Sequence, residues 1–272
     1  MYCLDIEISL SISIIFMSRD IWDPVTYAVY ADERSRPFIE LISRVGAVEP
    51  DYVVDAGCGS GELTVELGSR WPNATIEGFD SSPAMITKAR KLETRARFAV
   101  ADVATWRPDR PIDVLISNAV LQWVPHHRDV LEHWVEVVAP GGWLAFQVPG
   151  NFDAPSHVAI RELCASRTWS DRLGDYSRGN PVGDPLEYVD LLNQGGSQVD
   201  AWETTYVHIL HGENPVLEWV SGTALRPILD RLDPDEQRRF KQDLAKPLAE
   251  AYPARSYGTP FPFRRVFVVA QK

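Results

Sequence analysis

The amino-acid sequence predicts an α/β fold built on a doubly wound, mostly parallel sheet. Between residues 36 and 150, short apolar runs alternate with helical segments at close spacing. Each predicted strand carries a short apolar run rather than a strict alternation of apolar and polar residues, which is typical of parallel strands buried on both faces. A glycine-rich segment, Asp55 to Gly61, follows the first run and precedes a helix, as in many nucleotide-binding α/β proteins.

The predicted elements of this region follow one another without long gaps. Ser81-Ser82-Pro83 is typical of a helix N-terminus, because serine caps the first turn and proline is tolerated there. In chain order, the predicted helices are Pro37–Val45, Glu62–Arg70, Pro83–Leu92 and His127–Val138, and the predicted strands are Tyr52–Asp55, Thr75–Asp80, Arg97–Val100, Ile112–Ser117 and Trp143–Val148.

From residue 151 onward the sequence changes in character. Helical segments rich in Trp, Arg and Asp alternate with turn-forming stretches. Two strand-like runs, Val199–Leu210 and Arg265–Ala270, enclose a long helical stretch at Pro215–Tyr252. We expect the two runs to complete a seven-stranded Rossmann-like sheet whose last strand is antiparallel. The helical insertions are expected to form a cap over the carboxyl edge of that sheet.

The expected organisation is a single domain preceded by a short leader. Residues 1–17 contain an apolar run, Ile8–Phe16, that is too short to span a bilayer and lacks the basic flank of a signal peptide. They are interpreted as a leader with Met17 as the working start, or else as an ordered N-terminal strand or helix. Within residues 18–272, the expected parts are a cofactor-binding core at 18–150, a cap at 151–262 with a sheet strand near 199–210, and a last strand at 263–272.

The charge balance limits the classes of partner. The 272 residues carry a formal net charge of −11, and the sequence pI is about 5.0. A field of that sign repels polyanions, which argues against nucleic acid, whereas a small anion can still bind to a local group of arginines. Cys3, Cys58 and Cys164 have neither disulfide nor metal-ligand spacing, which fits a reducing cytoplasm. We expect a cytoplasmic monomer that binds no metal and no membrane.

The glycine-rich loop indicates the type of cofactor. Gly57 and Gly59 permit a tight turn and a close approach of a ligand to the backbone. Their GxGxG spacing differs from the GxGxxG of dinucleotide-binding proteins. The preceding Asp55 would repel a pyrophosphate, but it suits a cofactor that carries an ammonium group and a sulfonium. The loop therefore favours S-adenosylmethionine, with an NAD-dependent oxidoreductase as the alternative from another class.

Three further positions stand at the ends of later strands. Asp80 ends the second strand, where a carboxylate accepts hydrogen bonds from ribose hydroxyls, or else interacts with a helix dipole. Asp102 and Val103 follow the third strand. There the acid could bind an adenine amine while the valine packs on the adenine face, or else the two residues form an ordinary loop. Asn118 ends the strand that flanks the first one, at the switch point where ligands bind in open α/β sheets.

In this order, the motifs resemble those of the class I S-adenosylmethionine-dependent methyltransferases over roughly Tyr52–Pro149. The resemblance implies that the glycine loop holds the methionine part of the cofactor, that Asp80 binds its ribose and that Asp102 binds its adenine. It also implies that Ser81 and Met85 line the cofactor pocket, although Met85 is equally consistent with core packing.

A narrower resemblance extends over most of the chain after Met17. The segments that carry it are Trp22-Asp23-Pro24 with Tyr27, Asp32–Pro37, Asn118–Pro125, Gln147–Asn151, Glu218–Pro227 and Phe263–Ala270. Together they are similar to the trans-aconitate 2-methyltransferase family. Two features depart from the family pattern: His126 stands where an aspartate is more familiar, and the loop Gly258–Pro262 has no basic residue.

This resemblance implies a carboxyl O-methyltransferase that forms the monomethyl ester of trans-aconitate or a related polycarboxylate. A carboxylate is already deprotonated at neutral pH, so the reaction needs alignment and exclusion of water but no general base. Arginines would hold the remaining carboxylates bidentately. The substrate-binding residues that we expect are Arg226, Arg265, Trp219, Gln122, Trp123, Tyr206 and Arg36.

Another class of acceptor stays open at this point. A methyltransferase that acts on a small-molecule hydroxyl or nitrogen would need an acidic or histidine general base. His126, His127 and His133 cluster in the sequence, but no acid or cysteine accompanies them at ligand spacing. We therefore interpret these histidines as surface residues rather than metal ligands.

Overall fold

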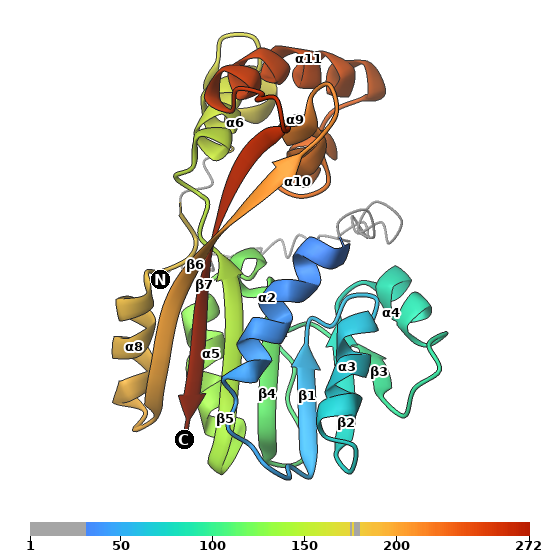
Figure 1. Ribbon diagram of the computed structural model, residues 1–272, viewed down its shortest axis with the longest axis vertical. Helices are drawn as coiled ribbons and strands as arrows, with labels where there is room; N and C mark the ends of the chain where they lie inside the picture. The colour runs from blue at the N-terminus through green and yellow to red at the C-terminus, as the bar shows by residue number, and fades with distance from the viewer. Residues whose placement is uncertain (1–30, 175, 177–179) are drawn as a thin grey trace, which may run out of the picture.

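One sheet organises the chain, and the seven strands of the described residues lie in it in the order β3-β2-β1-β4-β5-β7-β6 (Figure 1). The computed structural model describes residues 31–174, 176 and 180–272. The predicted leader at 1–17 and the motif residues Trp22, Asp23, Pro24 and Tyr27 lie outside this part. The strands are β1 (Tyr52–Ala56), β2 (Thr75–Asp80), β3 (Arg97–Val100), β4 (Ile112–Asn118), β5 (Val138–Pro149), β6 (Gln198–Leu210) and β7 (Thr259–Gln271).

The direction of the strands confirms the predicted fold class. The pairs among β1, β2, β3, β4 and β5 are all parallel. The strand β7 runs antiparallel to both of its neighbours, β5 and β6. The carboxyl ends of the parallel strands therefore meet at one edge, where α/β sheets bind their ligands.

Helices cover both faces of the sheet, and its central strands β1 and β4 are almost wholly buried. Side chains alternate between the two layers along each strand, so Ala145 of β5 joins one core and Phe146 the other. One core contains α2 (Ala31–Ser43) and α3 (Glu62–Arg70), the other contains α5 (His127–Val137) and α8 (Pro185–Gln194), and α4 (Pro83–Ala89) packs on β2 and β3. No helix in the described ranges is long and apolar enough to cross a membrane.

A helical cap lies beyond the carboxyl edge of the parallel strands (Figure 1). The outer ends of β6 and β7 carry it: they pair with each other from Tyr206 and Phe263 to Leu210 and Thr259, past the point where β5 ends. The cap has a hydrophobic cluster of its own. Its helices are α6 (Pro155–Ala165), α7 (Ser170–Leu173), α9 (Pro215–Ser221), α10 (Arg226–Leu229) and α11 (Pro234–Ala251).

The long helical stretch expected at Pro215–Tyr252 is divided into α9, α10 and α11. Ser221 and Thr223 bond through their hydroxyls to backbone carbonyls one turn earlier, and Gly222 ends α9. Such side-chain bonds compete with the backbone ladder and favour helix ends. A new helix then begins at Asp233, whose side chain caps α11.

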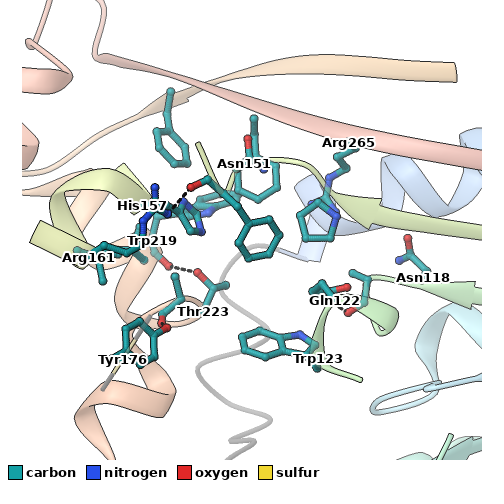
Figure 2. A pocket seen from close by; sticks show the side chains of 18 residues that line it. Asn118, Gln122, Trp123, Asn151, His157, Arg161, Tyr176, Trp219, Thr223 and Arg265 are labelled. Atoms are coloured by element: carbon teal, nitrogen blue, oxygen red, sulfur yellow. Dashed lines mark hydrogen bonds between the residues drawn. The ribbon is translucent and has the colours of Figure 1, made fainter. Parts of the chain in front are cut away.

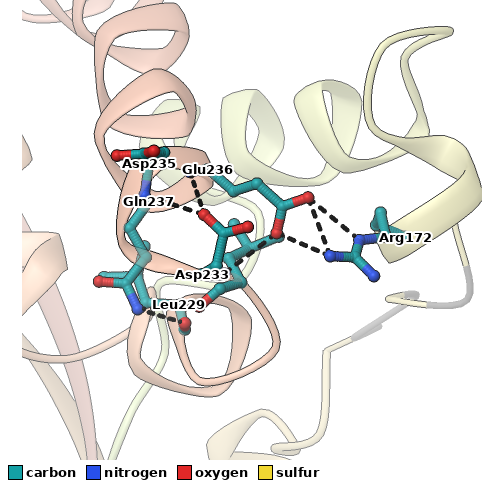
Figure 3. Close-up of polar contacts among 7 residues, drawn as sticks. Arg172, Leu229, Asp233, Asp235, Glu236 and Gln237 are labelled. Atoms are coloured by element: carbon teal, nitrogen blue, oxygen red, sulfur yellow. Dashed lines mark hydrogen bonds and ion pairs between the residues drawn. The ribbon is translucent and has the colours of Figure 1, made fainter.

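Polar contacts at the start of α11 join three helices of the cap (Figure 3). The carboxylate of Asp233 accepts hydrogen bonds from two backbone amides of the first turn. Arg172 of α7 donates to both carboxylate oxygens of Glu236, and Gln237 donates to the carbonyl of Leu229 at the end of α10. These contacts hold the short helices α7 and α10 against the long α11.

Candidate functional site

The glycine loop between β1 and α3 has left-handed backbone at three positions. Gly57, Gly59 and Gly61 have φ angles of 81°, 56° and 84°, a region that favours glycine. The amides of Gly57 and Cys58 both donate to the carbonyl of Phe79, at 2.8 and 2.9 Å. The loop is therefore attached to the end of β2, where a second cofactor residue is expected.

The two glycines expected at the cofactor differ in their surroundings. A Cβ on Gly57 would lie 2.2 Å from a methyl carbon of Val120, in the segment after β4. A Cβ on Gly59 would meet nothing within 4 Å. Gly57 therefore permits close packing inside the protein, whereas Gly59 leaves open space in which a ligand can approach the backbone.

Asp80 holds the loop and the next helix together at the end of β2. One carboxylate oxygen accepts from the amide of Gly59 at 3.0 Å, and the other accepts from the amide of Ser82 at 2.8 Å. Ser82 caps α4 by accepting from the amide of Met85 at 3.1 Å. Met85 itself is buried, while Ser81 is exposed beside it. Asp80 thus has the position expected of a ribose acceptor.

Asp55 is buried at the end of β1, with 2% of its surface exposed. Burial and, to a smaller extent, the negative charge of Asp80 raise the pKa of its carboxyl to about 7, although the hydrogen bond that Thr64 donates lowers it. A cation bound nearby would favour the ionised form. This carboxylate suits a cofactor with positive charge and would oppose a pyrophosphate.

The loop after β3 carries the residues expected at the adenine. Asp102 is exposed, and one of its carboxylate oxygens accepts from the amide of Ala104 at 2.8 Å. Val103 is buried in the core that contains α5 and α8. The structure thus offers the Asp102 carboxylate to a ligand at the sheet edge and uses Val103 for packing.

Asn118 ends β4 and borders a cleft between the sheet edge and the cap. Its side-chain oxygen is buried and accepts no hydrogen bond within the described chain. Because buried polar atoms in folded proteins are nearly always paired, this oxygen marks a place where a ligand donor fits. A group of three His, Cys, Asp or Glu that could hold a metal ion is not found among the described residues.

The cleft is open to solvent, and its empty space is about 1070 Å³ with the mouth included. Of the described residues expected at the cofactor, Asn118 alone is in its wall. Figure 2 shows residues from the sheet edge and from the cap around it. The side chains that line it are Asn118, Ala119, Gln122, Trp123, Pro149, Asn151, Phe152, His157, Ile160, Arg161, Tyr176, Trp219, Val220, Thr223, Ala224, Phe261, Phe263 and Arg265.

No aspartate or glutamate is among the described residues that line this cleft, although the whole chain has a net charge of −11. Its ionisable cationic side chains are Arg161, Arg265 and His157. The aromatic residues Trp123 and Trp219 cover apolar parts of the wall. The arrangement provides a locally positive and partly apolar site, which fits an organic anion.

Arg265 is the most buried basic side chain of the described cleft wall. It is 5% exposed, and its guanidinium donates to the side-chain oxygen of Gln147 at 3.0 Å, while the ring of Phe263 lies 4.8 Å away. The neighbouring Arg264 points to the other side of β7 and pairs with Asp184 and Glu203. The alternation of the strand therefore decides which of the two arginines faces the cleft.

Three residues expected at the acceptor do not line the cleft. Tyr206 of β6 donates instead to Glu40 of α2 at 2.5 Å, and burial raises the pKa of Tyr206 well above its usual value. The guanidinium of Arg36 lies 4.8 Å from the ring of Tyr206, on the same side of the sheet. Arg226 begins α10 and is also absent from the cleft wall.

Two basic side chains of the wall, His157 and Arg161 of α6, were not expected from the sequence. They are four residues apart, so they share one face of that helix. This spacing was available in the sequence, but nothing local indicates that α6 turns this face toward the sheet. Of the expected substrate residues, the cleft brings together Arg265, Gln122, Trp123 and Trp219.

Comparisons with known proteins agree with this geometry. A family model described as a methyltransferase domain matches residues 30–201. The chain is 53% identical over 253 residues to trans-aconitate 2-methyltransferase from Rhodococcus jostii (strain RHA1), covering 92% of this chain and 99% of the relative. It is 49% identical over 262 residues to trans-aconitate 2-methyltransferase from Streptomyces coelicolor (strain ATCC BAA-471 / A3(2) / M145), covering 92% and 86%.

A solved structure shares the fold at much lower identity. It is phosphoethanolamine N-methyltransferase 2 from Haemonchus contortus, in complex with phosphomonomethylethanolamine and S-adenosylhomocysteine. The two structures are 13% identical with a TM-score of 0.52, and the match covers 87% of this chain and 52% of that chain.

Proposed function

This chain belongs to the trans-aconitate 2-methyltransferase family, and from that premise we propose that it transfers a methyl group from S-adenosylmethionine to trans-aconitate. The proposed product is the monomethyl ester of trans-aconitate or of a closely related polycarboxylate. The chain is thus a methyltransferase, and the proposal concerns its donor and its acceptor.

The residues at the sheet edge fit this donor. Gly59 leaves open space at the backbone, Asp80 supplies the ribose acceptor and Asp55 supplies negative charge for the cationic part. Asp102 would take the adenine amine, and Asn118 has a buried oxygen to offer at the cleft. When bound, S-adenosylmethionine supplies an electrophilic methyl group.

The absence of acidic side chains from the described cleft wall carries the proposal for the acceptor. Arg265 and Arg161 offer guanidinium groups, which bind carboxylates bidentately. A neutral or cationic acceptor would gain nothing from these two charges. A polycarboxylate gains from both and is attracted locally despite the negative charge of the whole chain.

The protein's contribution to catalysis is orientation and the exclusion of water. Arg265 is held from behind by Gln147, so it is preorganised to orient a carboxylate before the reaction begins. Trp123, Trp219 and Phe263 provide apolar walls, which strip water from the reacting carboxylate oxygen. The acceptor is ionised at neutral pH, so no side chain has to remove a proton.

Turnover with a panel of acceptors tests the proposal. We expect purified protein, supplied with S-adenosylmethionine, to convert trans-aconitate to a monomethyl ester with release of S-adenosylhomocysteine, both followed by mass spectrometry. Arg265→Gln should raise the KM for trans-aconitate about tenfold or more, because a bidentate ion pair is lost. Arg167→Gln, at an exposed position outside the cleft wall, should behave as wild type. Methylation of amines or phenols without turnover of trans-aconitate would contradict the proposal.

His157 favours a second candidate function, a methyltransferase for a hydroxyl or nitrogen acceptor, because a histidine in the cleft wall is a usable general base. The pH dependence separates the two candidates. At saturating cofactor, a carboxylate acceptor predicts a flat kcat between about pH 6 and 9. A hydroxyl or amine acceptor predicts a rise near neutrality and a loss of about 10²–10⁴-fold in His157→Gln.

We further propose that the enzyme works as a cytoplasmic monomer. The scattered cysteines of the sequence, which fit a reducing compartment, support the proposed location. Size-exclusion chromatography with light scattering tests the oligomeric state, and a dimer would contradict it.

A further inference from the structure

Two arginines border the cleft from different parts of the fold. Arg161 comes from α6 in the cap, and Arg265 comes from β7 at the sheet edge. Figure 2 shows them on different sides of the space, with Asn118 on the side of Arg265 and His157 on the side of Arg161. A ligand that fills the cleft can therefore form ion pairs with both guanidinium groups only if it carries negative charge at two separate points.

The guanidinium of Arg161 is oriented but largely unused. One terminal nitrogen donates to the backbone carbonyl of Phe152 at 2.5 Å. The other lies 3.9 Å from Asp153, whose side chain is 82% exposed, and such exposed pairs are weak. An arginine has five N–H donors, so most of them form no hydrogen bond within the described chain. These donors suit a carboxylate that enters the cleft.

Asn151 connects the two arginines through the backbone. It is buried; its side chain donates to the carbonyl of Arg264 at 2.9 Å and accepts from the amide of Arg264 at 2.7 Å. Arg264 immediately precedes Arg265, and Asn151 immediately precedes Phe152, whose carbonyl holds Arg161. The turn from β5 to α6 is thereby joined to β7, so the backbone segments that carry the two arginines are held together.

We infer that Arg161 and Arg265 form a two-point carboxylate clamp whose spacing is set by Asn151. The clamp would hold two carboxylates of a tricarboxylate while the third is methylated, and it would therefore select tricarboxylates over shorter acids. This inference rests on the proposed function and adds to it how the acceptor is recognised. Arg161 and Arg265 are binding residues in this scheme, and Asn151 is a positioning residue.

Truncated acceptors allow the contact of Arg161 to be identified. Mesaconate and itaconate each lack one terminal carboxylate of trans-aconitate, and glutaconate lacks the central one. The experiment measures the Kd of these four acids by calorimetry in the presence of S-adenosylhomocysteine, for wild type, Arg161→Gln and Arg161→Lys. Arg167→Gln serves as the matched control, because it removes an exposed arginine just after α6.

The clamp predicts that Arg161→Gln weakens trans-aconitate binding about tenfold or more, and that Arg161→Lys has an intermediate effect. For one of the three truncated acids, the one without the carboxylate at Arg161, wild type and Arg161→Gln should bind equally. The affinity for S-adenosylhomocysteine and the Tm should stay near those of Arg167→Gln. If Arg161→Gln does not fold, the same comparison is made with Arg161→Lys.

Two results would overturn the clamp: unchanged binding of trans-aconitate, or an equal loss for all three truncated acids. Since calorimetry needs no turnover, these results are distinct from a failure of the proposed function. Tight binding of trans-aconitate that depends on Arg161, with no methyl ester formed, would contradict the function and leave the clamp in place. Asn151→Ala adds a positioning test, because it should raise the KM for trans-aconitate more than it lowers kcat.

Discussion

At the scale of single residues, Asp55 beside the cofactor loop makes the stability of the fold depend on pH. Folding raises the pKa of Asp55 from 3.8 to about 7, mainly by burial. Between these two values the folded state binds more protons at this residue than the unfolded state does. The contribution of Asp55 to stability therefore falls as the pH rises through that window, and above about pH 7 its charge is a cost.

We predict that Asp55→Asn is more stable than wild type above pH 7 and binds S-adenosylhomocysteine more weakly. The amide removes the buried charge but can still accept from Thr64. Between pH 4 and 8, the Tm of the variant should fall less with rising pH than the Tm of wild type. A variant that is less stable than wild type at pH 8 would show that the buried charge is not a cost.

Gly59 offers a second prediction at this scale, with a control of equal backbone strain. Gly59 and Gly141 have φ angles of 56° and 79°, and a Cβ at either would meet nothing within 4 Å. Alanine at either position should destabilise the fold by about 1–2 kcal/mol, the cost of left-handed backbone. Only Gly59→Ala should also weaken S-adenosylhomocysteine binding, by about tenfold or more, because its methyl enters the cofactor space. Calorimetry showing equal affinities in the two variants would argue against cofactor binding at this loop.

At the scale of elements, α2 is attached to the outer sheet strand β6 through Glu40. Tyr206 and Thr204 donate hydrogen bonds to its carboxylate at 2.5 and 3.0 Å. Burial would raise the pKa of Glu40, but these bonds and the charge of Arg36 hold it below the usual value. Tyr206 is thus a connector between a helix and a strand rather than a wall of the acceptor site.

We predict that Tyr206→Phe lowers the free energy of unfolding by about 1 kcal/mol at neutral pH. This loss is modest because Glu40 is partly exposed and solvent screens its charge. A carboxyl whose pKa is lowered by folding loses its contribution to stability as the pH falls through the folded pKa. The difference in the free energy of unfolding between wild type and Tyr206→Phe should therefore narrow in acid. Urea unfolding measures it, with the exposed Tyr257→Phe as the control. A substantial loss of trans-aconitate affinity in Tyr206→Phe would instead return this residue to the acceptor site.

At the scale of the whole molecule, the cleft lies between the edge of the sheet and the cap, which have separate hydrophobic cores. The sheet has cores on both faces, and the cap has a separate cluster carried by the ends of β6 and β7. A ligand that contacts Arg161 and Arg265 would bridge the cap and the sheet. Such a ligand would stabilise the arrangement in which the cap is held against the sheet, because ligands stabilise the states to which they bind.

We predict that hydrogen exchange distinguishes the two ligands. S-adenosylhomocysteine alone should slow exchange in the loops after β1 and β2. Addition of trans-aconitate should further slow exchange in α6 and α9, while the exposed start of α11 should change little. Protection by trans-aconitate that is confined to the sheet loops would show that the cap takes no part in acceptor binding.

Local sequence patterns were sufficient to predict the parallel strands and the glycine loop between residues 52 and 149. The parallel strands are short apolar runs, and the loop at Gly57 and Gly59 follows a strand directly, so neighbours in sequence are also neighbours in space. Strand-end acids such as Asp80 lie at the ligand edge because parallel strands end together. The helical stretch predicted at Pro215–Tyr252 is helical but divided into three helices, since side-chain bonds to the backbone at Ser221 and Thr223 help to end the first of them.

The sequence by itself was enough to predict the mostly parallel sheet and to suggest candidate residues for a positively charged cofactor. The tertiary structure decided the acceptor side, because its residues meet only through long-range contacts. Asn151 and Arg264 are 113 positions apart, and their pairing brings α6 and Arg161 beside β7. The alternation of β7 turns Arg265 toward the cleft and Arg264 away, and no local pattern distinguishes two adjacent arginines until the register of the sheet is known.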